Sequence, residues 1–474
     1  MQRYSILNYL CTAMKKKTKK IAYPFLLLFL FGLYTVGILS NSFAFAQTAY
    51  AFPFPVSEQK RNPPATASRP SISEVSILPG ISQTENYFPL LQGKNVAVTT
   101  NHTGLFPEKS NITSTQRILE NQELNSSHWD PLNNNSIETP VHLIDSLLHA
   151  GISIKAVFSP EHGFRSQAEA GEKVENSIDQ KTGLPLISLY GSHKKPSPSE
   201  LKGVDLMLID LQDVGVRFYT YISTLHYVME ACAQAGIPVV VLDRPNPNAS
   251  YIDGPVLDTH NCRSFIGLHP VPVVYGLTIG EYAQMINGEG WLENAISCDL
   301  CVIPIENYTH ESIYILPVSP SPNLRSMSAI YAYPSLCFFE GTPISVGRGT
   351  FKPFECFGYP KSHIGKYRFT PQSIKGMSQN PPYEDRCCRG FEIKSKEALQ
   401  NRESGKINLQ YLLKMYEDYP DKANFFTPFF KKLAGTEQLS KQIRQGLLEE
   451  EIRESWKKDI ESYKKIRDKY LLYM

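Results

Sequence analysis

The chain of 474 residues lacks the charge imbalance and the motifs of several large protein classes. Its net charge is only +2, with 48 basic and 46 acidic residues, so it has no basic surplus for binding nucleic acid. It has neither a Walker A loop nor a dinucleotide-binding glycine fingerprint, which disfavours nucleotide use. It also lacks the Gly-x-Ser-x-Gly elbow of serine hydrolases and the His-Glu-x-x-His motif of zinc proteases. No ligand spacing calls for a metal, and we expect no cofactor.

Cysteine is scarce, with nine residues in the whole chain. Cys298 and Cys301 have the spacing of a redox pair or half a zinc site, but no second pair lies nearby. Buried strand cysteines are therefore the better interpretation. Cys387 and Cys388 are adjacent and cannot easily bridge to each other, although either can pair elsewhere in an oxidising compartment.

The single dense basic run precedes a long apolar segment near the N-terminus. Residues 15–20 are rich in lysine, residues 21–39 are mostly apolar, and an Ala-x-Ala sequence ends at Ala46. This order predicts a signal peptide over residues 1–46 and export to the periplasm or the cell exterior. An uncleaved membrane anchor is the alternative, because the apolar stretch is almost long enough to span a bilayer. Residues 47–75 are rich in Pro and Ser and predict a tether.

Short apolar runs alternate with helical stretches from residue 76 onward. Such runs, without strict alternation and separated by helices, are typical of a parallel sheet covered on both faces. The pattern predicts a doubly wound α/β domain over residues 76–260, interrupted by a polar insertion at 107–139. Residues 261–474 predict a second, smaller α+β domain that ends in a long helix. The expected strands are 95–99, 154–158, 206–209 and 238–242, and the expected helices are 142–149, 223–235 and the tail from 437.

Polar side chains follow each of these four predicted strands. Because the carboxyl ends of parallel strands share one edge of a sheet, where ligands bind, the four clusters should converge. Glu161, in a tight turn beside His162, is a candidate general acid, and a structural loop glutamate is the alternative. The other candidates are Asn101 and His102 after the first strand, Arg165 after the second, Asp210, Asp213 and Arg217 after the third, and Asp243, Arg244 and Asn246 after the fourth.

Structural roles compete with functional ones in these clusters. Asp210 and Asp213 can supply a second carboxylate or bind ligand hydroxyls, but Asp213 can equally pair with Arg217. Asp243 and Arg244 have the same ambiguity. The asparagine and histidine of the first cluster suit a polyhydroxylated ligand, although a buried, hydrogen-bonded histidine is nearly as good an interpretation.

Two glycine-containing segments further along add a carboxylate and a guanidinium. Glu340 follows a predicted aromatic-rich strand at 337–339. Arg348 lies between two glycines that would let the backbone approach a ligand closely. A guanidinium in this setting suits a carboxylate or a phosphate.

At these motifs the sequence resembles the exo-β-N-acetylmuramidases of the NamZ type, a family of exported bacterial glycosidases. The resemblance extends from about residue 93 to the C-terminal helix. Its motifs include Thr-Asn-His-Thr-Gly at 100–104, Phe-Ser-Pro-Glu-His-Gly-Phe-Arg at 158–165, Leu-Gln-Asp-Val-Gly at 211–215, Leu-Asp-Arg-Pro-Asn-Pro at 242–247, Phe-Glu-Gly-Thr at 339–342 and Gly-Arg-Gly-Thr at 347–350.

The resemblance implies a Rossmann-like domain and a smaller domain with the site in the cleft between them. It implies hydrolysis of β-linked N-acetylmuramic acid from the non-reducing end of peptidoglycan fragments. Glu161 matches the family's Pro-Glu-His-Gly motif and is the expected catalytic acid. The lactyl carboxylate of muramic acid would be a ligand for Arg348 or Arg244.

The sequence also departs from the family pattern. Residues 248–250 replace the more typical glycines, Pro343 replaces a common Asn, and Ser166 replaces a usual Gly, which bears on substrate fit more than on reaction class. A non-catalytic cell-wall sugar-binding protein on the same fold is one competing hypothesis. A hydrolase of another acidic amino sugar or a phosphosugar is the other. The second catalytic carboxylate is left open among Asp210, Asp213, Asp243 and Glu340.

Overall fold

The computed structural model describes residues 76–107, 141–161, 163–164 and 176–474. The predicted signal peptide and tether, almost all of the polar insertion, and the candidate residues His162 and Arg165 lie outside these ranges. No helix within them is long and apolar enough to cross a membrane.

Seven strands form one sheet in the order β3-β4-β2-β1-β5-β6-β7. Every neighbouring pair is parallel except β3 with β4. The predicted α/β fold class is therefore confirmed, and β7 extends the sheet beyond residue 260. The strands are β1 (Asn95–Thr100), β2 (Ser153–Ser159), β3 (Ser177–Ile178), β4 (Pro185–Ser188), β5 (Leu206–Asp210), β6 (Val239–Leu242) and β7 (Leu300–Ile303).

Two separate hydrophobic clusters cover the two faces of this sheet. Successive strand residues point to opposite faces, so Val96 and Val98 of β1 belong to one cluster and Ala97 to the other. Helices α2 (Thr84–Leu91) and α4 (Leu143–His149) pack on the first face. On the second face lie α5 (Tyr221–Ala235) and α6 (Ile279–Gly288), and α5 ends at Gly236, whose left-handed backbone (φ 67°) forms its C-cap.

The second cluster continues into the C-terminal part of the chain, which carries a three-stranded antiparallel sheet in the order β8-β10-β9. These strands are β8 (Cys356–Tyr359), β9 (Tyr367–Phe369) and β10 (Cys388–Glu392). The helices of this part are α7 (Met327–Leu336), α8 (Ser395–Glu403), α9 (Gln410–Asp418), α10 (Phe430–Ala434), α11 (Gln438–Arg444) and α12 (Glu449–Arg467), and short 3-10 helices span Gly80–Ser82, Glu293–Ala295, Cys337–Gly341 and Lys422–Asn424.

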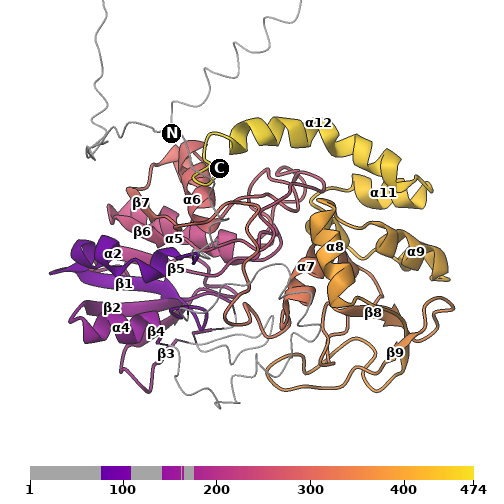
Figure 1. Ribbon diagram of the computed structural model, residues 1–474, viewed down its shortest axis with the longest axis horizontal. Coiled ribbons are helices and arrows are strands. Elements are labelled where there is room, and N and C mark those ends of the chain that lie inside the picture. Colours follow the sequence, from indigo (N-terminus) through magenta and orange to yellow (C-terminus); the bar gives the residue numbers. More distant parts are fainter. Residues whose placement is uncertain (1–75, 108–140, 162, 165–175) are drawn as a thin grey trace, which may run out of the picture. The chain divides into compact units, whose positions relative to one another are not determined.

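The C-terminal tail is helical as predicted, but Gly446 divides it into α11 and α12. Gly446 has a φ of 75°, a left-handed conformation that interrupts a helix. The buried face of α12 carries Ile452, Trp456 and Ile460 at four-residue steps, so an apolar stripe docks this helix on the core. Figure 1 shows α12 in yellow, with the C-terminus returning beside α6.

Two local predictions are wrong. Residues 337–339 are not a strand but part of the 3-10 helix η4 (Cys337–Gly341), which continues directly from α7. A short apolar run that is buried on all sides has no periodicity to distinguish strand from helix. Cys301 is exposed, because β7 is an edge strand, while Cys298 is buried just before that strand. The cysteines from Cys232 to Cys388 are all free thiols.

Candidate active site

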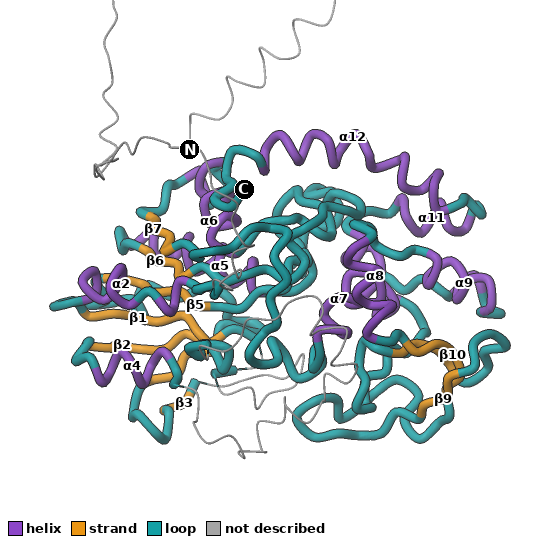
Figure 2. Tube along the Cα trace, viewed as in Figure 1, coloured by secondary structure: helices purple, strands orange, loops and turns teal. Residues whose placement is uncertain are grey.

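A cavity of about 380 Å³ lies where loops after the parallel strands meet the segments around α7 and η4. Glu161 enters it from the loop after β2, residues 218–220 enter from the loop between β5 and α5, and Tyr221 enters from the first residue of α5. Figure 2 shows that most of the chain between the sheet and helices α7 and α8 is loop. A cavity therefore lies at the edge of the sheet that the strand-end argument predicted, although only some of the predicted clusters reach it.

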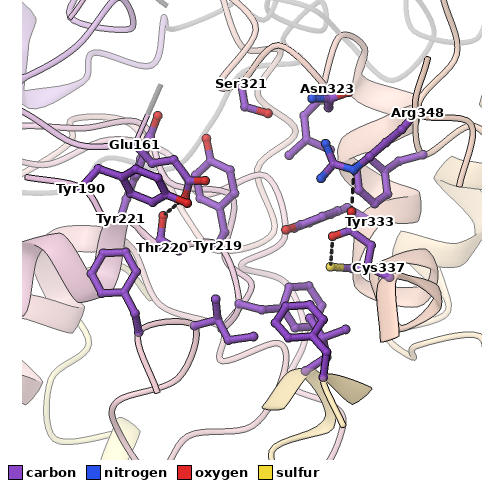
Figure 3. A pocket seen from close by; sticks show the side chains of 18 of the residues that line it. Glu161, Tyr190, Tyr219, Thr220, Tyr221, Ser321, Asn323, Tyr333, Cys337 and Arg348 are labelled. Atoms are coloured by element: carbon purple, nitrogen blue, oxygen red, sulfur yellow. Dashed lines mark hydrogen bonds and ion pairs between the residues drawn. The ribbon is translucent and has the colours of Figure 1, made fainter. Parts of the chain in front are cut away.

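One wall of the cavity carries Glu161 (Figure 3). The Thr220 hydroxyl donates a hydrogen bond to Glu161 Oε2 at 2.9 Å. Thr220 precedes the first turn of α5 but makes no side-chain capping bond there. The neighbouring Tyr219 and Tyr221 hydroxyls both donate to the Pro320 carbonyl, at 2.7 and 3.2 Å. These bonds tie the wall to the segment around residue 320 and fix the two rings.

Figure 3 shows Arg348 across the cavity from Glu161, and Arg348 is paired with Glu340. Arg348 Nε lies 2.5 Å from Glu340 Oε1, and both side chains are about one-fifth exposed (21% and 22%). The Cys337 thiol donates to the other oxygen, Oε2, at 3.5 Å. Burial alone would lower the pKa of Arg348, but the Glu340 carboxylate outweighs it and raises that pKa. Glu340 therefore lies against a permanently charged cation.

Glycines beside Arg348 are required by the backbone. Gly347 and Gly349 have φ values of 78° and 77°, and a Cβ at either position would lie 2.6 Å from a neighbouring atom. The positive φ values and the close packing explain these two glycines without a ligand that approaches the backbone.

Aromatic rings make up much of the remaining cavity surface. A mainly apolar, aromatic lining with a few polar groups is typical of small-ligand sites. The ring of Phe429 is 40% exposed, so the cavity has an aromatic group at a solvent-accessible position. The aromatic lining residues are Tyr190, Phe218, Tyr219, Tyr221, Phe265, Tyr333, Phe354 and Phe429.

Asp210 and Arg244, two of the candidates, form a buried ion pair that does not line this cavity. Arg244 Nε lies 2.5 Å from Asp210 Oδ1, and one terminal nitrogen lies 2.8 Å from Oδ2. The side chains are 0% and 1% exposed. The pair bridges the ends of β5 and β6, which are neighbours in the sheet. Its geometry is that of a structural link.

Asp243 lies at the N-terminus of α6. It accepts hydrogen bonds from the Thr278 hydroxyl (2.7 Å), the Gly280 amide (2.8 Å) and the Tyr473 hydroxyl (2.6 Å). Burial raises the pKa of Asp243 to about 7, against the lowering effect of these bonds. The predicted catalytic or sugar-binding carboxylate thus anchors a helix and the C-terminus.

Asp213 and Arg217 do not pair with each other. Asp213 accepts from the Gly215 amide at 2.7 Å and from the Tyr275 hydroxyl, and burial raises its pKa to about 6. The Arg217 guanidinium is fully buried and donates to four backbone carbonyls, those of Pro255, Val271, Leu433 and Ala434. It therefore ties the chain together internally.

Asn101, His102 and Asn246 also hold loops in place. Asn101 Nδ2 donates to the Tyr221 hydroxyl at 2.6 Å, so it supports the cavity wall from behind. His102 Nε2 lies 2.7 Å from the Ser319 carbonyl. Asn246 Nδ2 donates to the Leu277 carbonyl at 2.8 Å and fills the space above Gly215.

Of the eleven candidates that the structure describes, three line the cavity: Glu161, Glu340 and Arg348. The cavity is also lined by Thr220, Cys337 and Lys194, which were not among the predicted site residues. Thr220 could have been predicted, since it follows the third predicted strand in an aromatic-rich loop. Among the described residues, no group of three or more His, Cys, Asp or Glu side chains is arranged to hold a metal ion.

A parallel α/β sheet with two carboxylates in one aromatic-lined cavity defines the class of α/β enzymes that act on small polar ligands. Family comparison makes the assignment specific. Residues 132–328 match the N-terminal model, and residues 331–473 the C-terminal model, of exo-β-N-acetylmuramidase NamZ. The chain belongs to this family.

One relative is similar along most of the chain, and two solved structures share the fold. The peptidoglycan β-N-acetylmuramidase NamZ of Bacillus subtilis (strain 168) is 37% identical over 356 residues, which cover 72% of this chain and 84% of the relative. A DUF1343 family protein (BF0379) from Bacteroides fragilis NCTC 9343 is 42% identical, with a TM-score of 0.72. A second one (BF0371) from the same organism is 27% identical, with a TM-score of 0.61. Each match covers 84% of this chain and 99% of the solved chain.

Proposed function

We propose that the protein is an exo-acting glycoside hydrolase that releases β-linked N-acetylmuramic acid from the non-reducing end of peptidoglycan fragments. Membership of the NamZ family supports this activity. The structural observation that carries the proposal is the presence of two carboxylates, Glu161 and Glu340, among the residues that line one cavity. Two carboxyl groups with divided roles are the usual machinery of glycoside hydrolysis.

We assign different roles to the two carboxylates. Glu340 lies 2.5 Å from Arg348 Nε, and we assign it as the nucleophile or as the base toward water. Glu161 accepts a hydrogen bond from the Thr220 hydroxyl, and it matches the family's Pro-Glu-His-Gly motif, whose glutamate is the expected catalytic acid. Glu161 is suited to give its proton to the glycosidic oxygen as the bond from that oxygen to the anomeric carbon breaks.

Hydrolysis of a chromogenic β-N-acetylmuramide tests the proposal. We expect the wild-type protein to turn it over and the corresponding glucosaminide to react more slowly. On a muramide whose leaving group is a sugar alcohol and therefore needs a proton, Glu161→Gln should lower kcat by about 10²- to 10⁴-fold, the usual contribution of a general acid. The matched control is Glu306→Gln, because Glu306 is exposed and does not line the cavity. Full activity of Glu161→Gln would remove Glu161 from the mechanism.

A non-catalytic sugar-binding protein is the weaker alternative. The relative with 37% identity is itself a muramidase, which favours the enzyme. Tight binding of muramic acid sugars by the wild-type protein without turnover is the result that would favour a binding protein.

We further propose that the protein acts outside the cytoplasm, in the periplasm or the medium. The basic, apolar and Ala-x-Ala segments of residues 1–46 support export. N-terminal sequencing of the exported protein should find a mature chain that begins at Gln47. A chain that retains residues 1–46 in the membrane fraction would indicate an anchor instead.

A further inference from the structure

Two cationic side chains, Arg348 and Lys194, are found among the described residues that line the cavity. Arg348 is paired with Glu340. The Lys194 ammonium lies 4.8 Å from the centre of the Phe265 ring. The Phe265 ring in turn stacks on Tyr227, with 6.2 Å between ring centres and an interplanar angle of 15°. Lys194 is therefore a cation held on a rigid aromatic support at the cavity.

The next residue provides a contrast. Lys195 forms an ion pair with Glu230, with a distance of 2.7 Å between Nζ and Oε1, and it does not line this cavity. Lys194 has no carboxylate within ion-pair distance in the described part of the chain. The two adjacent lysines thus differ in their partners. Lys195 pairs with the carboxylate of Glu230, whereas Lys194 makes a cation–π contact with the Phe265 ring.

We propose that Lys194 binds the lactyl carboxylate of the muramic acid residue and so determines the preference for muramic acid over glucosamine. This inference rests on the proposed function. Muramic acid differs from glucosamine only by the lactyl ether on O3, so a cation that recognises this group is a specificity determinant. The earlier expectation gave this role to Arg348 or Arg244.

The structure disfavours both arginines for this role. Arg244 is buried against Asp210 and does not reach the cavity. An anion placed on Arg348 would also lie near Glu340, and two neighbouring carboxylates repel each other. A carboxylate beside Lys194 meets an aromatic surface and a positive charge.

Binding and turnover measurements on Lys194→Met test the proposal. The binding arm compares N-acetylmuramic acid with N-acetylglucosamine by calorimetry and needs no catalysis. The kinetic arm compares a chromogenic muramide with its neutral lactyl carboxamide. The wild-type protein should favour the carboxylate ligand by roughly 10- to 100-fold in each arm, the range for a hydrogen bond to a charged group. Lys194→Met should lose most of this preference while keeping its affinity for N-acetylglucosamine.

Two further variants complete the design. Lys194→Arg keeps a cation and should retain much of the preference, whereas Lys202→Met removes an exposed lysine outside the cavity and should behave as wild type. An unchanged carboxylate preference in Lys194→Met overturns the proposal. Absence of wild-type turnover would count against the proposed activity alone, because the binding arm still decides the role of Lys194.

Discussion

The chain contains two arginine–carboxylate pairs with the same closest distance and opposite surroundings. In both pairs an arginine Nε lies 2.5 Å from a carboxylate oxygen. Asp210 and Arg244 are almost completely buried, whereas Glu340 and Arg348 are about one-fifth exposed at the cavity. The same chemical pair is therefore enclosed in the core at one position and accessible at the cavity at the other, where we propose that it holds a catalytic carboxylate. Accessibility to a ligand makes the difference.

Exchanging each carboxylate for its amide separates the two roles and gives the largest expected effects. Glu340→Gln should lower kcat by about 10²- to 10⁴-fold and the free energy of unfolding by about 1 kcal/mol or less, because its pair is partly exposed. Asp210→Asn should lower the free energy of unfolding by about 3–5 kcal/mol, since it leaves the Arg244 charge buried without a partner. Its activity per folded molecule should stay close to the wild-type value.

Chemical denaturation and kinetics on the same preparations measure both quantities. A large loss of kcat in Asp210→Asn with unchanged stability would reverse the comparison and return Asp210 to the list of catalytic carboxylates.

The sequence predicted the edge of the sheet where the cavity lies better than it predicted which side chains line the cavity. Buried, β-branched runs such as Val239–Leu242 predicted the parallel sheet, and the sheet in turn predicted which loops share an edge. Glu161 was found in this way. Asp210 and Asp213 follow a strand just as closely, but their side chains turn into the core.

Long-range contacts explain these failures. The partner of Asp210 is 34 residues away on the neighbouring strand, and one partner of Asp243 is Tyr473, 230 residues away. Hydrogen-bond partners at such separations depend on packing and have no local signature. The resemblance of the motifs indicated the family and the reaction class. It could not distinguish Arg244, which is buried, from Arg348, which lines the cavity.

A buried carboxylate without a cation should differ from the two arginine-paired carboxylates in how its contribution to stability depends on pH. Asp243 has hydroxyl and amide donors but no side-chain cation among its hydrogen-bond partners, and burial raises its pKa to about 7. The folded state therefore holds a proton that the unfolded state releases near pH 4, and stability from this group is lost as the pH rises from about 4 through about 7.

Comparison of the wild-type protein with Asp243→Asn isolates this effect, because other titrating groups, including the buried His226 with a pKa lowered to about 4, are common to both. The wild-type advantage in free energy of unfolding should shrink between pH 4.5 and pH 7.5, on the order of 1 kcal/mol per unit of pKa shift. A difference that does not change with pH would contradict this account.

The smallest expected effect concerns the hydroxyl beside Glu161. Thr220→Val keeps the shape of the side chain but removes the hydrogen bond of 2.9 Å to Glu161. The loss of one hydrogen bond, about 1 kcal/mol, should lower kcat roughly fivefold. Thr220→Ser retains the hydroxyl and should stay near the wild-type value. Equal effects of the two substitutions would point to packing instead of hydrogen bonding.

The assignment of Glu161 as general acid is tested most directly by a leaving-group comparison. Two β-N-acetylmuramides are needed, one with a sugar alcohol as leaving group and one with 4-nitrophenolate, which departs without a proton. The account predicts that Glu161→Gln loses far more activity on the first than on the second, while Glu340→Gln loses activity on both. Equal losses on the two substrates in Glu161→Gln would contradict it.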